Sequence, residues 1–538
     1  MRNKEDILKK MQRVSEGWWF AAICVIILSI VGATYYFGIV KMVVPSSEDC
    51  MQIYHHWLGI TSGNRTAFHE DIIGTISDTI AYSVLGCTYN AVRLNWTIKY
   101  GFLLFIVGII STLFAKNKKT NILLCPIFIL FLIEQHLFEE NSRYAWSYSS
   151  DVDMLTFYPS NYHLGPIIAG FICIALVYLI KEELNNKNKI ILSVITIIIS
   201  IYYFLYGDLI FYVVFLIPYT IYLIICWWHN DRSRYRLLYG TILLGIGLIS
   251  TKFAIGTKLH DFLWTSNSSS RRVYGEVSWT IFENLSQWID NATYMVLCMF
   301  NIDRAYSTVI SVWSLLLIIR LILLLMVFYL VIVVVVTGLK DINRFDVIDY
   351  ICSYSIVIFI FAKIFTQFCW GLDRYFFSIV PLSVILLIRN FDIVVFCITR
   401  VNIHDDAKLR YLLCVVGCII AILGVNNVWS RETKDTDRDN IENVITYMEK
   451  NGEGYAIAKY TLYARMGVQA QGRELFFENQ EMHDKYFKEE KPRYIIANWD
   501  EGVCQAYRWP NSEEEFIEEY GTPVDTQKYG NIWLHRMW

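Results

Sequence analysis

The stretch WWFAAICVIILSIVGATYYFGIVKMVV, residues 18–44, decides the fold class of this chain. It is longer than the ~20 apolar residues that a helix needs to cross the ~30 Å hydrocarbon core of a bilayer. A polar, basic segment precedes it, and no small-residue cleavage site accompanies it. It is too long for the apolar region of a secretory signal, so we expect a retained membrane anchor whose N-terminus is cytoplasmic.

Further apolar runs recur along the 538-residue chain, of which 55% is hydrophobic and only 18% charged. Soluble domains rarely reach that balance, because they need a charged surface. About eleven runs are long enough to be drawn as spans, so we expect a mainly α, polytopic membrane protein. The runs are 18–44, 98–114, 121–137, 163–180, 190–206, 209–228, 237–254, 307–338, 347–365, 375–398 and 411–428.

Lysine and arginine residues orient these spans. They cluster in every second connection, on the side of the basic segment 1–17, as the positive-inside rule requires of cytoplasmic loops. The opposite connections are richer in acidic residues, and the large ones are residues 45–97, 138–162 and 256–306. We therefore expect a transmembrane bundle over residues 18–428 of a multi-pass cell-membrane protein. An odd number of crossings places the C-terminus outside.

After residue 428 the composition changes to that of a soluble domain. An amphipathic helix is expected over 437–450, strands over 455–460 and 493–498, and a hairpin that turns at 529–531. We predict a small extracytoplasmic α/β domain over residues 429–538.

Several classes of function find no support in the sequence. There is no extended basic tract that would indicate a nucleic-acid partner, and no P-loop, GxSxG, HExxH or GxGxxG motif in a suitable context. His55, His56 and His69 share the first outer loop without a familiar metal-ligand spacing, and the adjacent pair would point to different sides of a helix, so we favour no metal site there and leave the metal question open. Cys50 and Cys87 share the first outer loop, which leaves a disulfide between them as an open alternative.

An acidic pair, Glu48 and Asp49, follows the first span directly. A carboxylate at the membrane–water boundary can act as a general base on a hydroxyl or hold a divalent cation. An outer loop also carries acids because they do not oppose its export, so this alternative stays open.

The second outer loop holds a D-x-D pair, Asp151 and Asp153, which can chelate a metal or a metal–phosphate group. Such short patterns also arise by chance. Asn161 and Tyr162 lie where the fourth span begins. They either face an outer cavity or belong to a helix cap and an aromatic belt.

Two basic residues lie near the outer boundary. Arg374 precedes a late span, and its planar guanidinium suits a lipid-linked phosphate. Pairing with Asp373 or with lipid headgroups is the alternative. Lys363 lies about one turn inside the boundary, and ionisable groups within a membrane are by default candidates for function.

The layout resembles the GT-C superfamily of polytopic glycosyltransferases, most of all the bacterial branch around the O-antigen glucosyltransferases. In that family an acidic pair follows the first helix, as Glu48-Asp49 does here. A Gly-Arg element often follows, for which this chain has Gly63-Asn64-Arg65, with an inserted Asn. Ser160-Asn161-Tyr162 and Arg374-Tyr375 match two further short motifs.

The resemblance implies a transfer of sugar from a polyprenyl-phosphate donor to a surface glycan, lipid or protein acceptor, with inversion of configuration. Asp49 would be the catalytic base with Glu48 beside it, and Arg374 with Lys363 would bind the donor phosphate. The substrate pocket would include Arg65, Asp151, Asp153, Asn161 and Tyr162. Whether a divalent cation such as Mg²⁺ or Mn²⁺ assists stays open.

Two other functions remain as alternatives. A transporter or lipid flippase usually shows internal repeats, and no convincing two-fold repeat is visible here. A glycan polymerase or ligase would place its Arg and His residues in one large late loop, whereas the best-placed acids of this chain come early.

Overall fold

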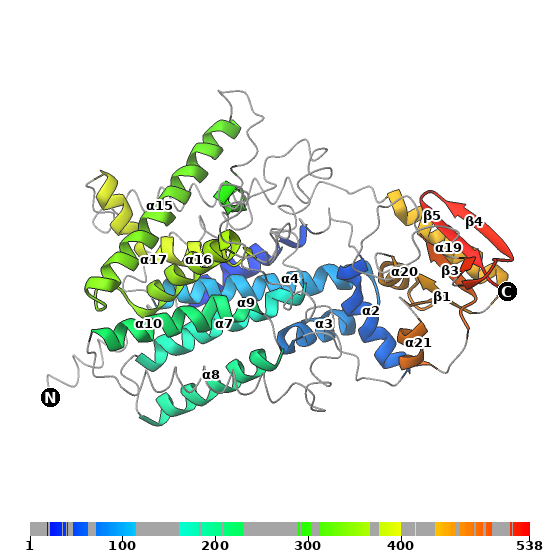
Figure 1. Ribbon diagram of the computed structural model, residues 1–538, viewed down its shortest axis with the longest axis horizontal. Coiled ribbons are helices and arrows are strands. Elements are labelled where there is room, and N and C mark those ends of the chain that lie inside the picture. Colours follow the sequence, from blue (N-terminus) through cyan, green and yellow to red (C-terminus); the bar gives the residue numbers. More distant parts are fainter. Residues whose placement is uncertain are drawn as a thin grey trace. The chain divides into compact units, whose positions relative to one another are not determined.

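A computed structural model describes part of the chain, which divides into two compact units (Figure 1). The helical unit comprises residues 1–39 and 99–430, and the mixed unit comprises residues 40–98 and 431–538. The described residues are 19, 22–34, 36–38, 40, 47–62, 71–114, 161–181, 186–206, 209–229, 289–290, 292–293, 295–297, 300, 302, 312–365, 376–399, 415, 436–452, 454–458, 462–477, 480–487, 491–497, 517–518 and 520–538.

Long apolar helices make up the described part of the helical unit. Helix α7 packs against α8, and α16 packs against α10, α15 and α17. Their bounds are α7 (Asn161–Lys181), α8 (Asn186–Tyr206), α9 (Leu209–Phe211), the π-helical η5 (Tyr212–Leu216), α10 (Ile217–Trp228), α15 (Val312–Lys340), α16 (Val347–Phe365) and α17 (Ile379–Thr399). Helix α4 (Tyr89–Gly108) begins in the mixed unit and continues, through the π-helical η2 (Ile109–Leu113), in the helical unit.

Three of the described helices are long and apolar enough to cross a membrane: Tyr89–Leu113, Arg320–Lys340 and Val347–Ile364. The predicted membrane class is confirmed to this extent, while the number of about eleven spans stays a prediction. The runs 121–137 and 237–254, and all of 411–428 except residue 415, lie outside the described residues.

Small residues allow these helices to approach closely, as in membrane proteins generally. A Cβ at Gly170 of α7 would lie 2.6 Å from Val214, and one at Gly338 of α15 would lie 2.5 Å from the Tyr350 ring. Away from these contacts, apolar side chains such as Ile198 of α8 and Leu325 of α15 are exposed. The faces that pack against other helices and the faces with exposed apolar side chains are thus different.

The mixed unit joins the first predicted outer loop to the C-terminal segment. Its sheet has the order β2-β1-β3-β5-β4, in which β2, β1 and β3 are parallel and β5 is antiparallel to both neighbours. The elements are α2 (Ser47–Ser62), α3 (Ile72–Leu85), α19 (Thr436–Asn451), β1 (Tyr455–Ala458), α20 (Tyr463–Ala470), β2 (Leu475–Phe477), α21 (Gln480–Tyr486), β3 (Tyr494–Ala497), β4 (Asp525–Tyr529) and β5 (Ile532–Arg536).

The predicted C-terminal helix, both predicted strands and the hairpin are confirmed, within a few residues at their ends. Strands β1 and β3 are buried along their whole length, which explains their unbroken apolar character. Gly530 turns the β4–β5 hairpin with a positive φ of 61°. The segment 431–538 shares its compact unit with residues 40–98, so this sheet packs with part of the first predicted outer loop.

Candidate functional site

The predicted acidic pair, Glu48 and Asp49, lies in the first turn of α2. Their side chains lie outside the described part of the structure. From the buried Cys50 onward, the structure describes the side chains of α2. The position of the pair is therefore set by whatever holds this helix.

Helix α2 is fastened to the edge of the C-terminal sheet by Tyr54. The Tyr54 hydroxyl donates to the carbonyl of Phe476 at 3.0 Å and accepts from the amide of Phe476 at 2.9 Å. Phe476 belongs to β2, an outer strand of the sheet, whose free backbone groups otherwise need a partner. One side chain of α2 thus satisfies both polar backbone groups of one residue at this edge.

Close approach between α2 and α20 depends on glycine. A Cβ at Gly467 would lie 2.2 Å from the Tyr54 ring, and one at Gly472 would lie 2.8 Å from the Trp57 ring. Nε2 of His55 lies 3.0 Å from the Tyr463 hydroxyl, and both side chains are buried. The contact between α2 and α20 is therefore tight and specific.

The other side of α2 contacts α3 and α4 through polar groups. The ring centroid of His56 lies 4.7 Å from that of Tyr82 on α3. Nδ2 of Asn95 on α4 donates to Gln52 of α2 at 3.0 Å, and the Ser77 hydroxyl donates to Oδ1 of Asn95 at 2.5 Å. His55 and His56 therefore point to different sides of α2, as predicted. Among the described residues no group of three metal-ligating side chains occurs.

Lys363 is the only one of the predicted site residues whose side chain the structure describes. It lies in the last turn of α16 and is only 4% exposed, with its ammonium 5.4 Å from the centre of the Phe376 ring. A buried cation acts in a low dielectric, where its attraction for an anion is strong. This placement is compatible with the predicted role in binding a phosphate.

The other predicted residues lie outside what the structure describes. Asn161 and Tyr162 are in the first turn of α7, but their side chains are not among the described ones. The whole of Arg65, Asp151, Asp153 and Arg374 falls outside the described ranges. The convergence of these groups on one pocket therefore stays a prediction.

Cys50 and Cys87 are both buried free thiols, so the alternative of a disulfide between them is wrong. Burial raises the pKa of Cys87 to about 12, because a thiolate is disfavoured away from water. The thiol stays protonated at neutral pH and has little nucleophilic character.

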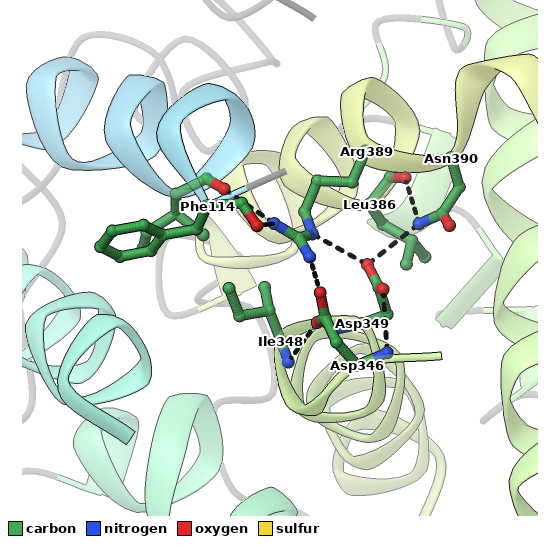
Figure 2. Close-up of polar contacts among 8 residues, drawn as sticks. Phe114, Asp346, Ile348, Asp349, Leu386, Arg389 and Asn390 are labelled. Atoms are coloured by element: carbon green, nitrogen blue, oxygen red, sulfur yellow. Dashed lines mark hydrogen bonds and ion pairs between the residues drawn. The ribbon is translucent and has the colours of Figure 1, made fainter. Parts of the chain in front are cut away.

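A second polar cluster lies inside the helical unit, between α16, α17 and the end of η2 (Figure 2). Nε of Arg389 donates to Asp349 at 3.0 Å, and another guanidinium nitrogen pairs with Asp346. The remaining nitrogen donates to the carbonyls of Ile110 and Phe114, each at 3.0 Å. All three guanidinium nitrogens are thus hydrogen-bonded, and they connect three segments of the chain.

The carboxylates of this cluster have local roles as well. Asp346 accepts from the amide of Ile348 at 2.8 Å and from that of Asp349 at 3.3 Å, so it caps the start of α16. Burial raises the pKa of Asp346 above its ordinary value, the nearby Asp349 adds to the rise, and Arg389 opposes it. Nδ2 of Asn390 also donates to Asp349, at 3.0 Å. Because its donors are engaged by protein groups, Arg389 joins helices rather than offering a binding site.

Sequence reasoning missed this cluster, although a signal for it was present. Arg389 interrupts the apolar run 375–398, and Asp349 interrupts the run 347–365. The rule that drew attention to Lys363 applies equally to both residues. Opposite charges in neighbouring apolar runs predict an ion pair as readily as a ligand site.

Comparison with known proteins adds nothing to these observations, because no family model and no curated protein matches this chain. Any function must therefore be argued from its residues. The two features that bear on it are the acidic start of α2 and the buried cation of α16.

Proposed function

We propose that this protein is an integral membrane glycosyltransferase of the GT-C type. It would move a sugar from a polyprenyl-phosphate donor to a glycan, lipid or protein acceptor on the outer face of the cell membrane. The observation that carries the proposal is the place of Glu48 and Asp49, in the first turn of a helix that is fastened to the C-terminal sheet. A catalytic group must be held within a fraction of an ångström, and a rigidly docked helix provides that.

The two chain segments that form the mixed unit support the proposed topology. One compact unit takes in residues 40–98 and 431–538, and such a unit lies on one side of a bilayer. An even number of crossings must then separate these two segments. The predicted apolar runs that follow the first run, 18–44, are even in number, so they meet this condition. With a cytoplasmic N-terminus, the charge bias puts both segments outside.

The proposed reaction is a single displacement. The Asp49 carboxylate removes the proton of the acceptor hydroxyl while that oxygen attacks the anomeric carbon. The bond from this carbon to the phosphate oxygen breaks, and polyprenyl phosphate leaves with the bonding electrons. Arg374 and Lys363 stabilise the charge on the departing phosphate. Attack opposite to the leaving group inverts the configuration.

The remaining predicted residues would line the substrate pocket and have supporting roles. Asp151 and Asp153 have the spacing to hold Mg²⁺ or Mn²⁺, if the reaction uses a cation. Arg65, Asn161 and Tyr162 would contact the sugar or the acceptor through hydrogen bonds.

A transporter is the second candidate, favoured by the buried charges of Arg389, Asp346 and Asp349. Ionisable groups within membrane helices often mark a transport pathway. In this cluster, however, each guanidinium nitrogen is bound by a carboxylate or a backbone carbonyl. Such saturation favours a structural role and leaves the glycosyltransferase as the better candidate.

The proposal is tested by substituting Asp49→Asn and comparing surface glycans by mass spectrometry with those of cells that carry the wild-type gene or lack it. We expect the variant to match the deletion, with normal expression in the membrane. Asp439→Asn, an exposed carboxylate on α19, is the matched control and should leave the glycans unchanged. Wild-type glycans from Asp49→Asn would remove Asp49 from the mechanism. Identical glycans with and without the gene would overturn the enzyme proposal, and unaltered passage of a substrate into proteoliposomes would establish a transporter.

A further inference from the structure

Helix α3 has its polarity reversed with respect to a helix of a soluble protein. Its exposed side chains include Ile72, Ile76, Ile80 and Val84, at four-residue spacing and between 46% and 66% exposed. Its buried residues are Gly74, Ser77, Asp78 and Ala81. A helix on a water-exposed surface shows the opposite pattern, with apolar groups inside and charges outside. Asp78 is the one charged residue of α3, and it is only 4% exposed.

Specific contacts fix this orientation of α3. The Asp71 carboxylate accepts from the amide of Gly74 at 2.8 Å and caps the helix start. On the buried face, Ser77 donates to Asn95 of α4, which itself donates to Gln52 of α2. The polar face is therefore held by α4 and α2, and the apolar face must point away from both.

The connection to α4 places α3 at a bilayer surface. The amide of Gly86, with a φ of 66°, donates to the carbonyl of Tyr82 at 2.7 Å and ends α3. Residues 86–88 are all that separates it from α4, and the apolar helix Tyr89–Leu113 is long enough to cross a membrane. Ser77 of α3 donates to Asn95, close to Ile98, where α4 passes from the mixed unit into the helical unit, so α3 lies beside the segment from which α4 enters the bilayer. At 14 residues α3 is about 21 Å long, too short to span a ~30 Å core itself.

We infer that α3 is an interfacial helix that inserts Ile72, Ile76, Ile80 and Val84 into the boundary between headgroups and acyl chains of the leaflet that α4 enters. An amphipathic helix with an apolar face lies flat at this depth. Through the contacts of Asn95 and Gln52, α3 would set the height of α2 above the membrane. The inference depends on α4 crossing the bilayer and not on the proposed chemistry.

The test uses the full chain in nanodiscs of phosphatidylcholine and phosphatidylglycerol. An environment-sensitive fluorescent amino acid replaces Ile76 or Ile80, and two quenchers are compared: a nitroxide on the lipid acyl chain near the headgroup, and iodide in the water. Val524, beside the C-terminal sheet, serves as the aqueous control, and Leu325 of α15 as the lipid control; both are well exposed. We expect the lipid nitroxide to quench positions 76 and 80 several-fold more than position 524, and iodide to quench them several-fold less.

Two outcomes would overturn the inference. Quenching by iodide as strong as at position 524 would place α3 in water. Weak quenching by both agents would show that protein, either another segment or a second copy, covers the apolar face. Photolabelling of the unsubstituted protein by a lipid with a diazirine near the headgroup provides a second measurement free of folding effects. Peptides of residues 72–85 should carry the label, and their absence among labelled peptides would contradict the inference.

Discussion

Arg389 shows at the scale of one residue how a charge is accommodated among apolar helices. It makes four hydrogen bonds, two to carboxylates and two to carbonyls at the end of η2. The carbonyls at a helix end lack partners within the helix, and a buried arginine can supply them. The same side chain thereby fixes η2 against α16 and α17.

Replacing Arg389 by Met should destabilise the protein strongly. Two carboxylates would lose their cationic partner and two carbonyls the donor that Arg389 supplies, and removing one partner of a buried ion pair costs about 3–5 kcal/mol. Thermal unfolding of the purified protein in detergent, followed by size-exclusion chromatography, measures this loss. The exposed Arg344 is the matched control, and Arg344→Met should unfold like wild type. Adding Asp346→Asn and Asp349→Asn to Arg389→Met should recover part of the loss. Wild-type unfolding of Arg389→Met would contradict the structural role.

Glu442 and Arg473 form an ion pair of the opposite kind, on the surface of the mixed unit. The two guanidinium–carboxylate distances are 2.8 and 3.1 Å. The hydrogen bonds from Arg473 hold the pKa of Glu442 below its ordinary value. Both side chains are more than 40% exposed, so water screens the pair and its contribution is at most about 1 kcal/mol.

This pair predicts a weak dependence of local stability on pH. Because the folded pKa of Glu442 lies below the unfolded value of about 4.3, its stabilisation is present above that value. It is lost as the pH falls through the folded pKa. Glu442→Gln should speed hydrogen exchange of the α19 amides slightly at pH 7 relative to wild type, with no difference at a pH below the folded pKa. Comparison at equal pH removes the intrinsic exchange rate, and Glu518→Gln is the control. A difference that persists in acid would contradict this account.

At the scale of elements, the contact between α2 and the edge strand β2 organises the mixed unit. It combines the Tyr54 hydroxyl, which satisfies both polar groups of Phe476, with the absent side chain of Gly467. An unpaired edge strand invites association with other chains, and α2 covers part of that edge.

Tyr54→Phe should weaken this contact while keeping the ring. The buried amide and carbonyl of Phe476 would lose their partner, at a cost of about 1–3 kcal/mol. Hydrogen exchange in the peptide that covers β2 should become faster, whereas strands β4 and β5 should keep their protection. Tyr529→Phe, on the partly exposed strand β4, is the control and should leave β2 unchanged. Unchanged protection of β2 in Tyr54→Phe would show that the hydroxyl does not stabilise the edge.

At the scale of the whole molecule, sequence patterns predicted local structure better than contacts between distant segments. The amphipathic pattern of 437–450 and the turn at 529–531 correspond to α19 and the β4–β5 hairpin, because each depends on neighbouring residues. The pairing of α2 with α20 depends on the fit of Tyr54 against Gly467. The periodicity of apolar residues does not predict such complementarity between surfaces that are far apart in the chain. For the candidate site, sequence placed Glu48 and Asp49 directly after the first span, but it predicted neither helix α2, on which they lie, nor the contact that fastens this helix to the sheet.

Because two distant segments of the chain form the mixed unit, its structure predicts a topology. Residues 40–98 and 431–538 should lie in the same compartment, which we expect to be outside. A reporter fused after Trp538 and an epitope inserted between residues 63 and 70 should give the same result in a protease-protection assay. A tag before residue 18 should report the opposite, cytoplasmic side. Opposite results from the first two positions would rule out the mixed unit in the membrane-inserted protein.

Because residues 99–430 separate the two halves of the mixed unit, its assembly has a necessary order in time. At about 5–20 residues per second, the ribosome needs on the order of tens of seconds to make that stretch. During this interval the face of α2 that carries Tyr54 and Trp57 has no α20 to cover it. An mRNA truncated before the codon of residue 463 would yield a chain in which that aromatic face stays exposed, and we expect quality-control proteases to degrade this chain.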